Sequence, residues 1–174
     1  MFTMDLPFLV NMDPPLPLTM ILYKMNNYFS AKQVHLEDRC HLSSSSKVGM
    51  LATYGMDNII NTFQLESDTQ NTFELNENEN FTAMTLAPDG SHCLLARGST
   101  IFSYNFEEKE VSQLCENVSL GNITGLQYGS TGHMVAVASE EGKNVILEPR
   151  SGRKEKCRPG HNRPAVTVVL SNDE

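Results

Sequence analysis

The sequence predicts an all-β fold made of short antiparallel strands. From about Val34 onward, β-prone runs of five to eight residues alternate with breaks rich in Gly, Asn, Asp and Ser. No window carries a persuasive apolar stripe at helical spacing. The runs also recur in the same order along the chain, and they are VGMLATY, NIINTFQL, HCLLARG, TIFSYNF, HMVAVAS and NVILEP.

The residue types within these runs suit half-buried strands. Val, Ile, Thr, Phe and Tyr dominate several of them, and these residues pack well on a pleated surface. In the run TIFSYNF, the aromatic residues Phe102, Tyr104 and Phe106 fall on one face, because side chains alternate along a strand. Such a face is expected to pack against another sheet.

The runs group into copies of nearly constant length. Copies begin near Thr82 and near Ile123, which are 41 residues apart, and again near Ala165, 42 residues further on. The Pro-Asp-Gly turn at 88–90 and the Ser-Thr-Gly turn at 130–132 occur at the same phase of the repeat. This period is in the range expected for the four-stranded blades of a β-propeller.

The predicted architecture is therefore a partial β-propeller with three four-stranded antiparallel blades and one further strand. The blades are expected at about 34–78, 79–120 and 121–163, and the start of the next at 164–174. Residues 1–33 are expected to be an irregular extension, because prolines at positions 14, 15 and 17 break helices and central strands. Closed propellers have about 4–8 blades, so we expect the remaining blades to be missing, as in part of a longer product, or to be supplied by another chain.

The repeats resemble the WD-repeat family. A Gly160-His161 pair stands about five residues before the run AVTVVL, and LATYGMDNIINTFQL is similar to the family's small-residue strand, Gly-x-Asp turn and strand ending in an aromatic residue. The resemblance implies that Asp57 is the tight-turn aspartate, that Phe63 takes the place of the usual Trp, and that His161 bonds within its own blade. The chain has no Trp, so the Trp-Asp dipeptide of the family is absent.

The layout also resembles the opening of the replication-fork scaffolds called WD-repeat and HMG-box DNA-binding proteins. The segments that carry this likeness are HLEDRCHLSSSSKVGMLATYGMDNIINTF, RGSTIFSYNFEE, VSLGNITGLQYGSTGHMVAVAS and PGHNRPAVTVVL. The resemblance implies a nuclear adaptor that joins components of the replication machinery. It also places DNA or chromatin-associated assemblies among the expected partners.

The charge balance is acidic, with one basic exception. A formal net charge of -8 argues against wholesale non-specific nucleic-acid binding. The exception is a candidate contact patch formed by Arg150, Arg153, Lys154, Lys156, Arg158 and Arg163. On an outer strand, Lys154, Lys156 and Arg158 would share one face and contact phosphates or an acidic peptide. The alternative is that these residues protect a sheet edge from aggregation.

The sequence contains no pattern that indicates catalysis, a metal or a cofactor. The five His and four Cys are scattered, with no His-x-x-x-His or Cys-x-x-Cys spacing. We therefore expect a non-catalytic protein–protein interaction scaffold. Nucleic-acid contact through residues 150–163 and a propeller hydrolase remain alternatives. Without a secretory signal or a run of roughly 20 apolar residues, the chain is expected to be intracellular, more in the nucleus than in the cytoplasm, with no membrane partner.

Overall fold

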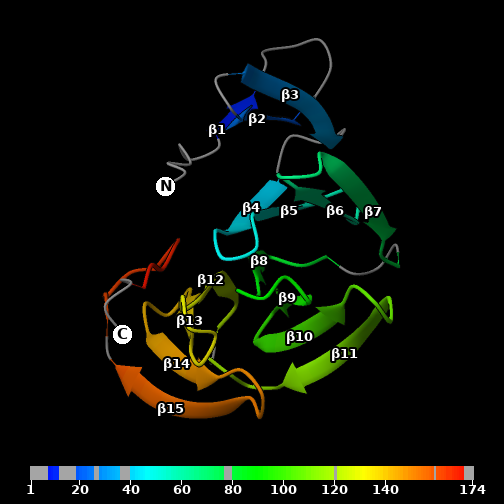
Figure 1. Cartoon of the computed structure of the whole chain (residues 1–174). Helices are drawn as coiled ribbons and strands as arrows, with labels where there is room; N and C mark the ends of the chain where they lie inside the picture. Colours follow the sequence, from blue (N-terminus) through cyan, green and yellow to red (C-terminus); the bar gives the residue numbers. More distant parts are fainter. Residues whose placement is uncertain are drawn as a thin grey trace.

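The computed structural model describes residues 8–11, 19–25, 28–35, 40–76, 80–119, 121–158 and 160–170. All regular structure in these ranges is β-strand (Figure 1). No helix that could span a membrane occurs in the part of the chain searched. The all-β prediction is therefore confirmed for the described residues.

Three four-stranded antiparallel sheets follow one another along the chain, and each strand pairs with the next in sequence. The first sheet contains β4 (Cys40–Ser45), β5 (Met50–Gly55), β6 (Ile59–Gln64) and β7 (Thr69–Glu74). The second contains β8 (Ala83–Leu86), β9 (His92–Arg97), β10 (Thr100–Asn105) and β11 (Glu110–Cys115). The third contains β12 (Ile123–Tyr128), β13 (Val135–Ser139), β14 (Asn144–Glu148) and β15 (Arg153–Arg158). The expectation of three antiparallel four-stranded sheets is thus confirmed.

The second sheet is buried on both faces. Cys93 and Leu95 of β9 belong to the apolar cluster shared with the first sheet. The alternate residues Leu94 and Ala96 belong to the cluster shared with the third sheet. This double burial explains why β9 is a continuous apolar run rather than an alternating one.

The first strands of the three sheets lie side by side. β8 contacts both β4 and β12, and the remaining strands of each sheet extend outward to β7, β11 and β15 (Figure 1). Gly90 and Gly132 have φ of 73° and 80° in the turns that follow β8 and β12, which is a conformation that favours glycine. Over the described ranges the sheets do not close into a ring.

The N-terminal part contains more regular structure than the sequence indicated. Strands β1 (Phe8–Asn11), β2 (Thr19–Met25) and β3 (Tyr28–His35) form a three-stranded antiparallel sheet, where residues 1–33 were expected to be irregular. The run TMILYKM is apolar and suits a strand. The prolines at 14, 15 and 17 fall between β1 and β2, outside the described residues, so they interrupt neither strand.

Candidate interaction surface

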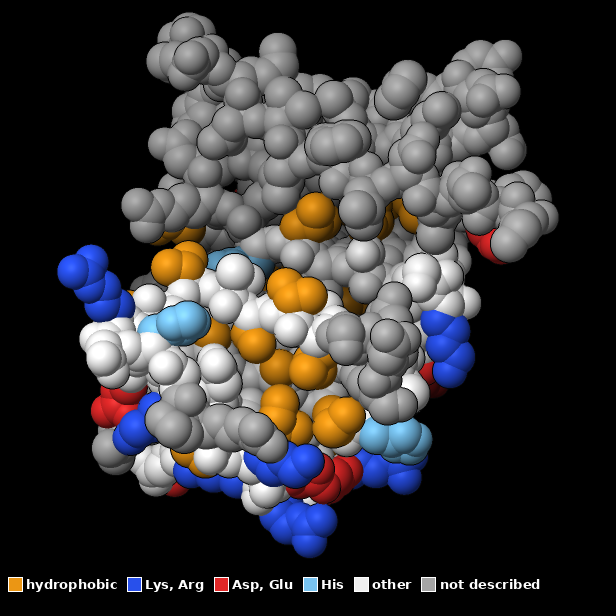
Figure 2. Space-filling view, turned by 90° about the vertical axis from the view of Figure 1, so that its left-hand side faces the viewer, with side chains coloured by type: hydrophobic (Ala, Val, Ile, Leu, Met, Phe, Trp, Pro, Cys, Tyr) orange, Lys and Arg blue, Asp and Glu red, His pale blue; other side chains and the backbone are white. Residues whose placement is uncertain are grey.

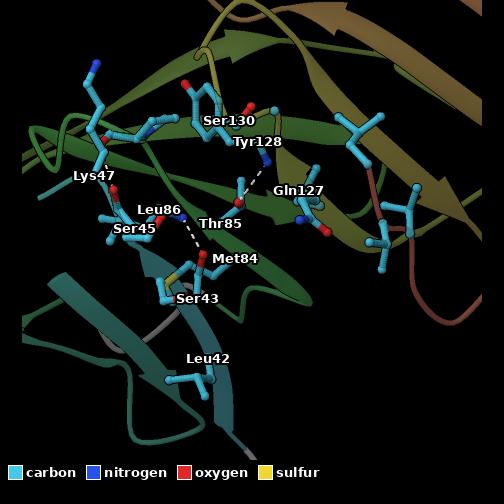
Figure 3. A pocket seen from close by; sticks show the side chains of 18 of the residues that line it. Leu42, Ser43, Ser45, Lys47, Met84, Thr85, Leu86, Gln127, Tyr128 and Ser130 are labelled. Carbon is cyan, nitrogen blue, oxygen red and sulfur yellow. Dashed lines mark hydrogen bonds between the residues drawn. The ribbon is translucent and has the colours of Figure 1, made fainter. Parts of the chain in front are cut away.

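Side-chain hydroxyls join the innermost strands of neighbouring sheets. Ser43 Oγ of β4 accepts a hydrogen bond of 2.9 Å from Leu86 N of β8. Thr85 Oγ1 of β8 accepts one of 3.1 Å from Tyr128 N of β12 (Figure 3). The two bonds are related by a shift of 42 positions, so Ser43 and Thr85 have the same role in successive repeats. No local motif in the sequence indicates these two roles, although the spacing of Ser43 and Thr85 matches the repeat.

A second repeated bond includes the C-terminal segment. Thr82 Oγ1 donates a 2.7 Å hydrogen bond to Ile123 O. Thr124, 42 positions later, donates the equivalent bond to Ala165 O. Ala165 is buried, and its N–H donates to Ser139 O. Residues 164–170 therefore run beside β12 as β12 runs beside β8, although they are not assigned as a strand.

A cavity of about 410 Å³ lies among β4, β8, β12 and residues 167–170. Its lining includes Gln127, Ser130 and Leu42, which are labelled in Figure 3. The polar Ser44 and the apolar Leu126 also line it. Ser44 and Ser130 are exposed. The lining therefore combines hydroxyl and amide groups with apolar side chains, a mixture that is common in binding pockets. No group of three side chains that could hold a metal ion occurs among the described residues.

A series of side-chain hydrogen bonds links the β8–β9 turn to the third sheet. Ser91 Oγ donates to Asp89 Oδ1 at 2.8 Å and lies 2.8 Å from His92 Nδ1. Because Ser91 has already donated its proton, Nδ1 of His92 is the donor in the second bond, and Nε2 accepts from the Tyr128 hydroxyl at 2.9 Å. These hydrogen bonds cannot be predicted from local sequence patterns, because they join two different sheets.

Burial and hydrogen bonding shift the acidity of these groups. Burial lowers the pKa of His92, and the neighbouring charge of Asp89 partly offsets that effect. The backbone N–H of Ser91 stabilises the carboxylate and lowers the pKa of Asp89. Burial raises the pKa of Tyr128. The neutral imidazole is therefore favoured between the two sheets.

Of the residues that carry the resemblance to WD repeats, Asp57 lies in a turn and Phe63 lies in the core. Asp57, between β5 and β6, accepts a hydrogen bond of 3.2 Å from Ile59 N. Phe63 of β6 is 3% exposed and packs with Leu51. The roles that the resemblance implies for them, Asp57 as the tight-turn aspartate and Phe63 in place of the usual Trp, stay predictions.

The Gly160-His161 pair packs against the β13–β14 turn. His161 N donates to Gly142 O at 2.9 Å, and a Cβ added at Gly160 would lie 2.3 Å from the same oxygen. Glycine is therefore required for this approach. The His161 side chain is exposed, and its imidazole has no hydrogen bond within the described ranges, so the bond that the resemblance implies is not observed there.

The strand β15 does not present its basic residues on one face. A β-bulge pairs Lys154 with Leu147 but Lys156 with Ile146. Ile146 and Leu147 are adjacent on β14, so their side chains point to opposite faces of the sheet. Their partners Lys156 and Lys154 therefore also point to opposite faces. In agreement, Lys154 and Cys157, three positions apart, line the same cavity of about 180 Å³. The expectation of a shared face for Lys154, Lys156 and Arg158 is corrected by this bulge, and the Arg158 side chain lies outside the described residues.

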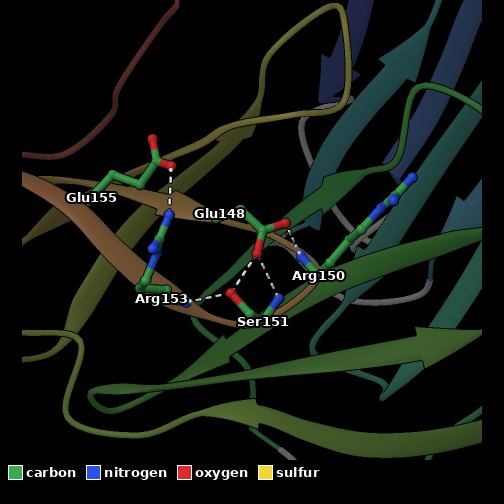
Figure 4. Close-up of polar contacts among 5 residues, drawn as sticks. All are labelled: Glu148, Arg150, Ser151, Arg153 and Glu155. Carbon is green, nitrogen blue, oxygen red and sulfur yellow. Dashed lines mark hydrogen bonds and ion pairs between the residues drawn. The ribbon is translucent and has the colours of Figure 1, made fainter.

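Acidic side chains lie among the basic residues of the β14–β15 hairpin. Glu148 accepts hydrogen bonds of 2.9 Å from the backbone N–H groups of Arg150 and Ser151 (Figure 4). The guanidinium of Arg153 lies 3.6 Å from Glu155 Oε1. Elsewhere on β15, Lys154 Nζ donates to Asn117 O. Acidic side chains therefore interrupt the basic residues of this hairpin, and the described side chains of 150, 153, 154, 156 and 163 are all exposed.

No protein-family model matches this chain, and no curated protein matches it. The internal repeat, the cavity among the innermost strands and the charge distribution are therefore the observations that bear on function.

Proposed function

We propose that the three sheets are consecutive blades of a WD-repeat-type β-propeller and that residues 164–170 begin the next blade. The main support is the repeat of inter-sheet hydrogen bonds at 42 positions, through Ser43 and Thr85 and again through Thr82 and Thr124. The burial of both faces of the second sheet adds to this support, because blades bury their faces only against neighbouring blades.

The function proposed for this scaffold is non-catalytic protein binding at the cavity among the innermost strands. The observation that carries this proposal is the exposed rim formed by Ser44 and Ser130, which belong to different sheets joined by the repeated hydrogen bonds. A rim that is already ordered loses little conformational entropy on binding. The resemblance to replication-fork scaffolds extends the proposal to a nuclear adaptor.

A capture experiment with paired variants tests the scaffold proposal. Ser44→Arg would fill the rim of the cavity without changing a buried residue. Ser112→Arg would place the same side chain at an exposed position on β11, far along the second sheet from its innermost strand. Proteins captured by the original chain should be lost with Ser44→Arg and kept with Ser112→Arg, as measured by quantitative mass spectrometry. Equal recovery of partners with the original chain, Ser44→Arg and Ser112→Arg would reject the cavity as the binding surface.

A second candidate function is nucleic-acid contact through residues 150–163. The observation that favours it is the exposure of Arg150 in the β14–β15 turn and of Arg153 and Lys156 on the outermost strand β15. Phosphate contacts of this kind weaken steeply as salt increases. A triple substitution of these residues by Ala should abolish any salt-sensitive binding of labelled duplex DNA. Binding that is undetectable, or unchanged by salt, would remove this candidate.

A further inference from the structure

The outermost strand of the first sheet lacks the features that protect the other two outer edges. β7 pairs with β6 over six consecutive residues without an irregularity and contains no Lys, Arg or Pro. In contrast, the pairing of β11 is interrupted by a bulge, and β15 has both a bulge and four basic residues. Bulges, basic residues and prolines are common means of preventing edge strands from pairing with other chains.

Three residues of β7 direct their backbone groups outward. Leu75 N donates to Asn58 O at 2.8 Å, which identifies this pair as a hydrogen-bonded one. Hydrogen-bonded and non-bonded pairs alternate in an antiparallel ladder. With the regular β6–β7 register, the N–H and C=O groups of Gln70, Thr72 and Glu74 therefore face away from β6. No described residue pairs with these backbone groups.

A cavity of about 650 Å³ opens beside this edge, between the first and second sheets. Its apolar lining includes Phe73 of β7, Phe106 of the β10–β11 turn and Met50 of β5. The rings of Phe73 and Phe106 lie 5.2 Å apart, tilted by 34°. A strand added to β7 could therefore place alternate apolar side chains against these rings, as peptide-binding sheet edges do.

Exposed acidic side chains surround the edge and the cavity. They are Glu66, Asp68, Glu74, Glu107 and Glu108, with Lys109 as a basic neighbour in the β10–β11 turn. Complementary charge contributes to specificity and to the rate of association. The edge is therefore suited to a positively charged segment.

We propose that β7 is a docking edge for an extended, positively charged segment of a partner protein, which adds to the first sheet as a fifth strand. Main-chain hydrogen bonds to Gln70, Thr72 and Glu74 would supply affinity, and the cavity beside Phe73 would select the side chains. This site goes beyond the proposed function, since it lies on the outer edge of the first sheet rather than at the cavity among the innermost strands.

A labelled peptide in which Lys and Val alternate tests the docking edge by fluorescence anisotropy with the full chain. Thr72→Pro removes an outward N–H but leaves the β6–β7 ladder intact. Gln113→Pro is the matched control on β11, where the same alternation leaves the N–H facing outward. We expect saturable binding that Thr72→Pro weakens at least about tenfold, which corresponds to the loss of about 1.4 kcal/mol, and that Gln113→Pro leaves unchanged.

Two further peptides keep the test decisive if Thr72→Pro does not fold. The same peptide with alternate backbone nitrogens methylated cannot form the ladder and should not bind. A peptide in which Glu and Val alternate should bind more weakly than the Lys peptide. The proposal is overturned by tight binding of the methylated peptide, by no saturable binding of the Lys peptide, or by equal affinity for the Glu peptide. A failure at β7 leaves the Ser44→Arg capture experiment unaffected.

Discussion

At the scale of single residues, His92 links the pH to the stability of the contact between the second and third sheets. Its imidazole accepts a hydrogen bond from Tyr128, and burial lowers its pKa from the ordinary value of 6.5. The unfolded chain therefore takes up a proton at a higher pH than the folded chain. The stabilisation is complete well above the unfolded-state pKa of 6.5 and is lost as the pH falls through that value toward the folded-state pKa.

A substitution at His92 should therefore flatten the pH dependence of stability. The free energy of unfolding of the original chain, measured with urea, should decrease between about pH 7.5 and about pH 5.5. His92→Gln should show a smaller decrease, while the remainder comes partly from His41, whose pKa burial also lowers. The exposed His161→Gln serves as the control. An identical pH dependence in His92→Gln and the original chain would contradict this assignment.

At the scale of elements, the strand groups could be predicted from the sequence but their irregularities could not. Turn residues such as those at 88–90 and 130–132 mark the ends of strands, and Gly90 and Gly132 have positive φ in these turns. The bulge in β15 depends on its pairing with β14, and nothing in the run RKEKCR indicates it. The bond between His92 and Tyr128 crosses two sheets, 36 positions apart, so local sequence patterns cannot reveal it.

A prediction at this scale concerns the close packing of residues 160–163 against the β13–β14 turn. A Cβ added at Gly142 would lie 2.0 Å from His161 O, and Gly142 has φ of 72°. Gly98 also has positive φ, 58°, but its nearest neighbour is Asn122 Oδ1 at 3.9 Å. Gly98→Ala should cost about 1–2 kcal/mol for the left-handed conformation alone. Gly142→Ala should cost at least about 1 kcal/mol more, because the added carbon collides with backbone.

Urea unfolding of both glycine variants measures this difference. Since the backbone strain is common to both, the difference between them reports the close packing of the segment that contains Gly160 and His161. Equal losses of stability would show that residues 160–163 move away from the turn without cost. That result would also weaken the proposal that residues 164–170 start another blade.

At the scale of the whole molecule, the stack of sheets has an apolar surface beside its C-terminal segment. Val166 is 80% exposed and Val169 is 75% exposed, while Ala165 of the same segment is buried. Figure 2 shows hydrophobic side chains gathered on the face that looks to the left in Figure 1, with Lys and Arg side chains below them. Apolar surface of this kind is usually covered by another part of a protein or by a partner.

We therefore expect the chain, studied alone, to self-associate through this surface. Light scattering should show a mass that increases with protein concentration. The double variant Val166→Asp, Val169→Asp should stay monomeric, because each Asp would place a charge in an apolar contact. Met56→Asp is the control, since Met56 is 57% exposed in the β5–β6 turn and should leave the association unchanged. The contrary result is a chain that is monomeric at every concentration and melts in one sharp transition. It would show that the three sheets are stable without further blades. The main reason for expecting another chain to supply those blades would then be removed.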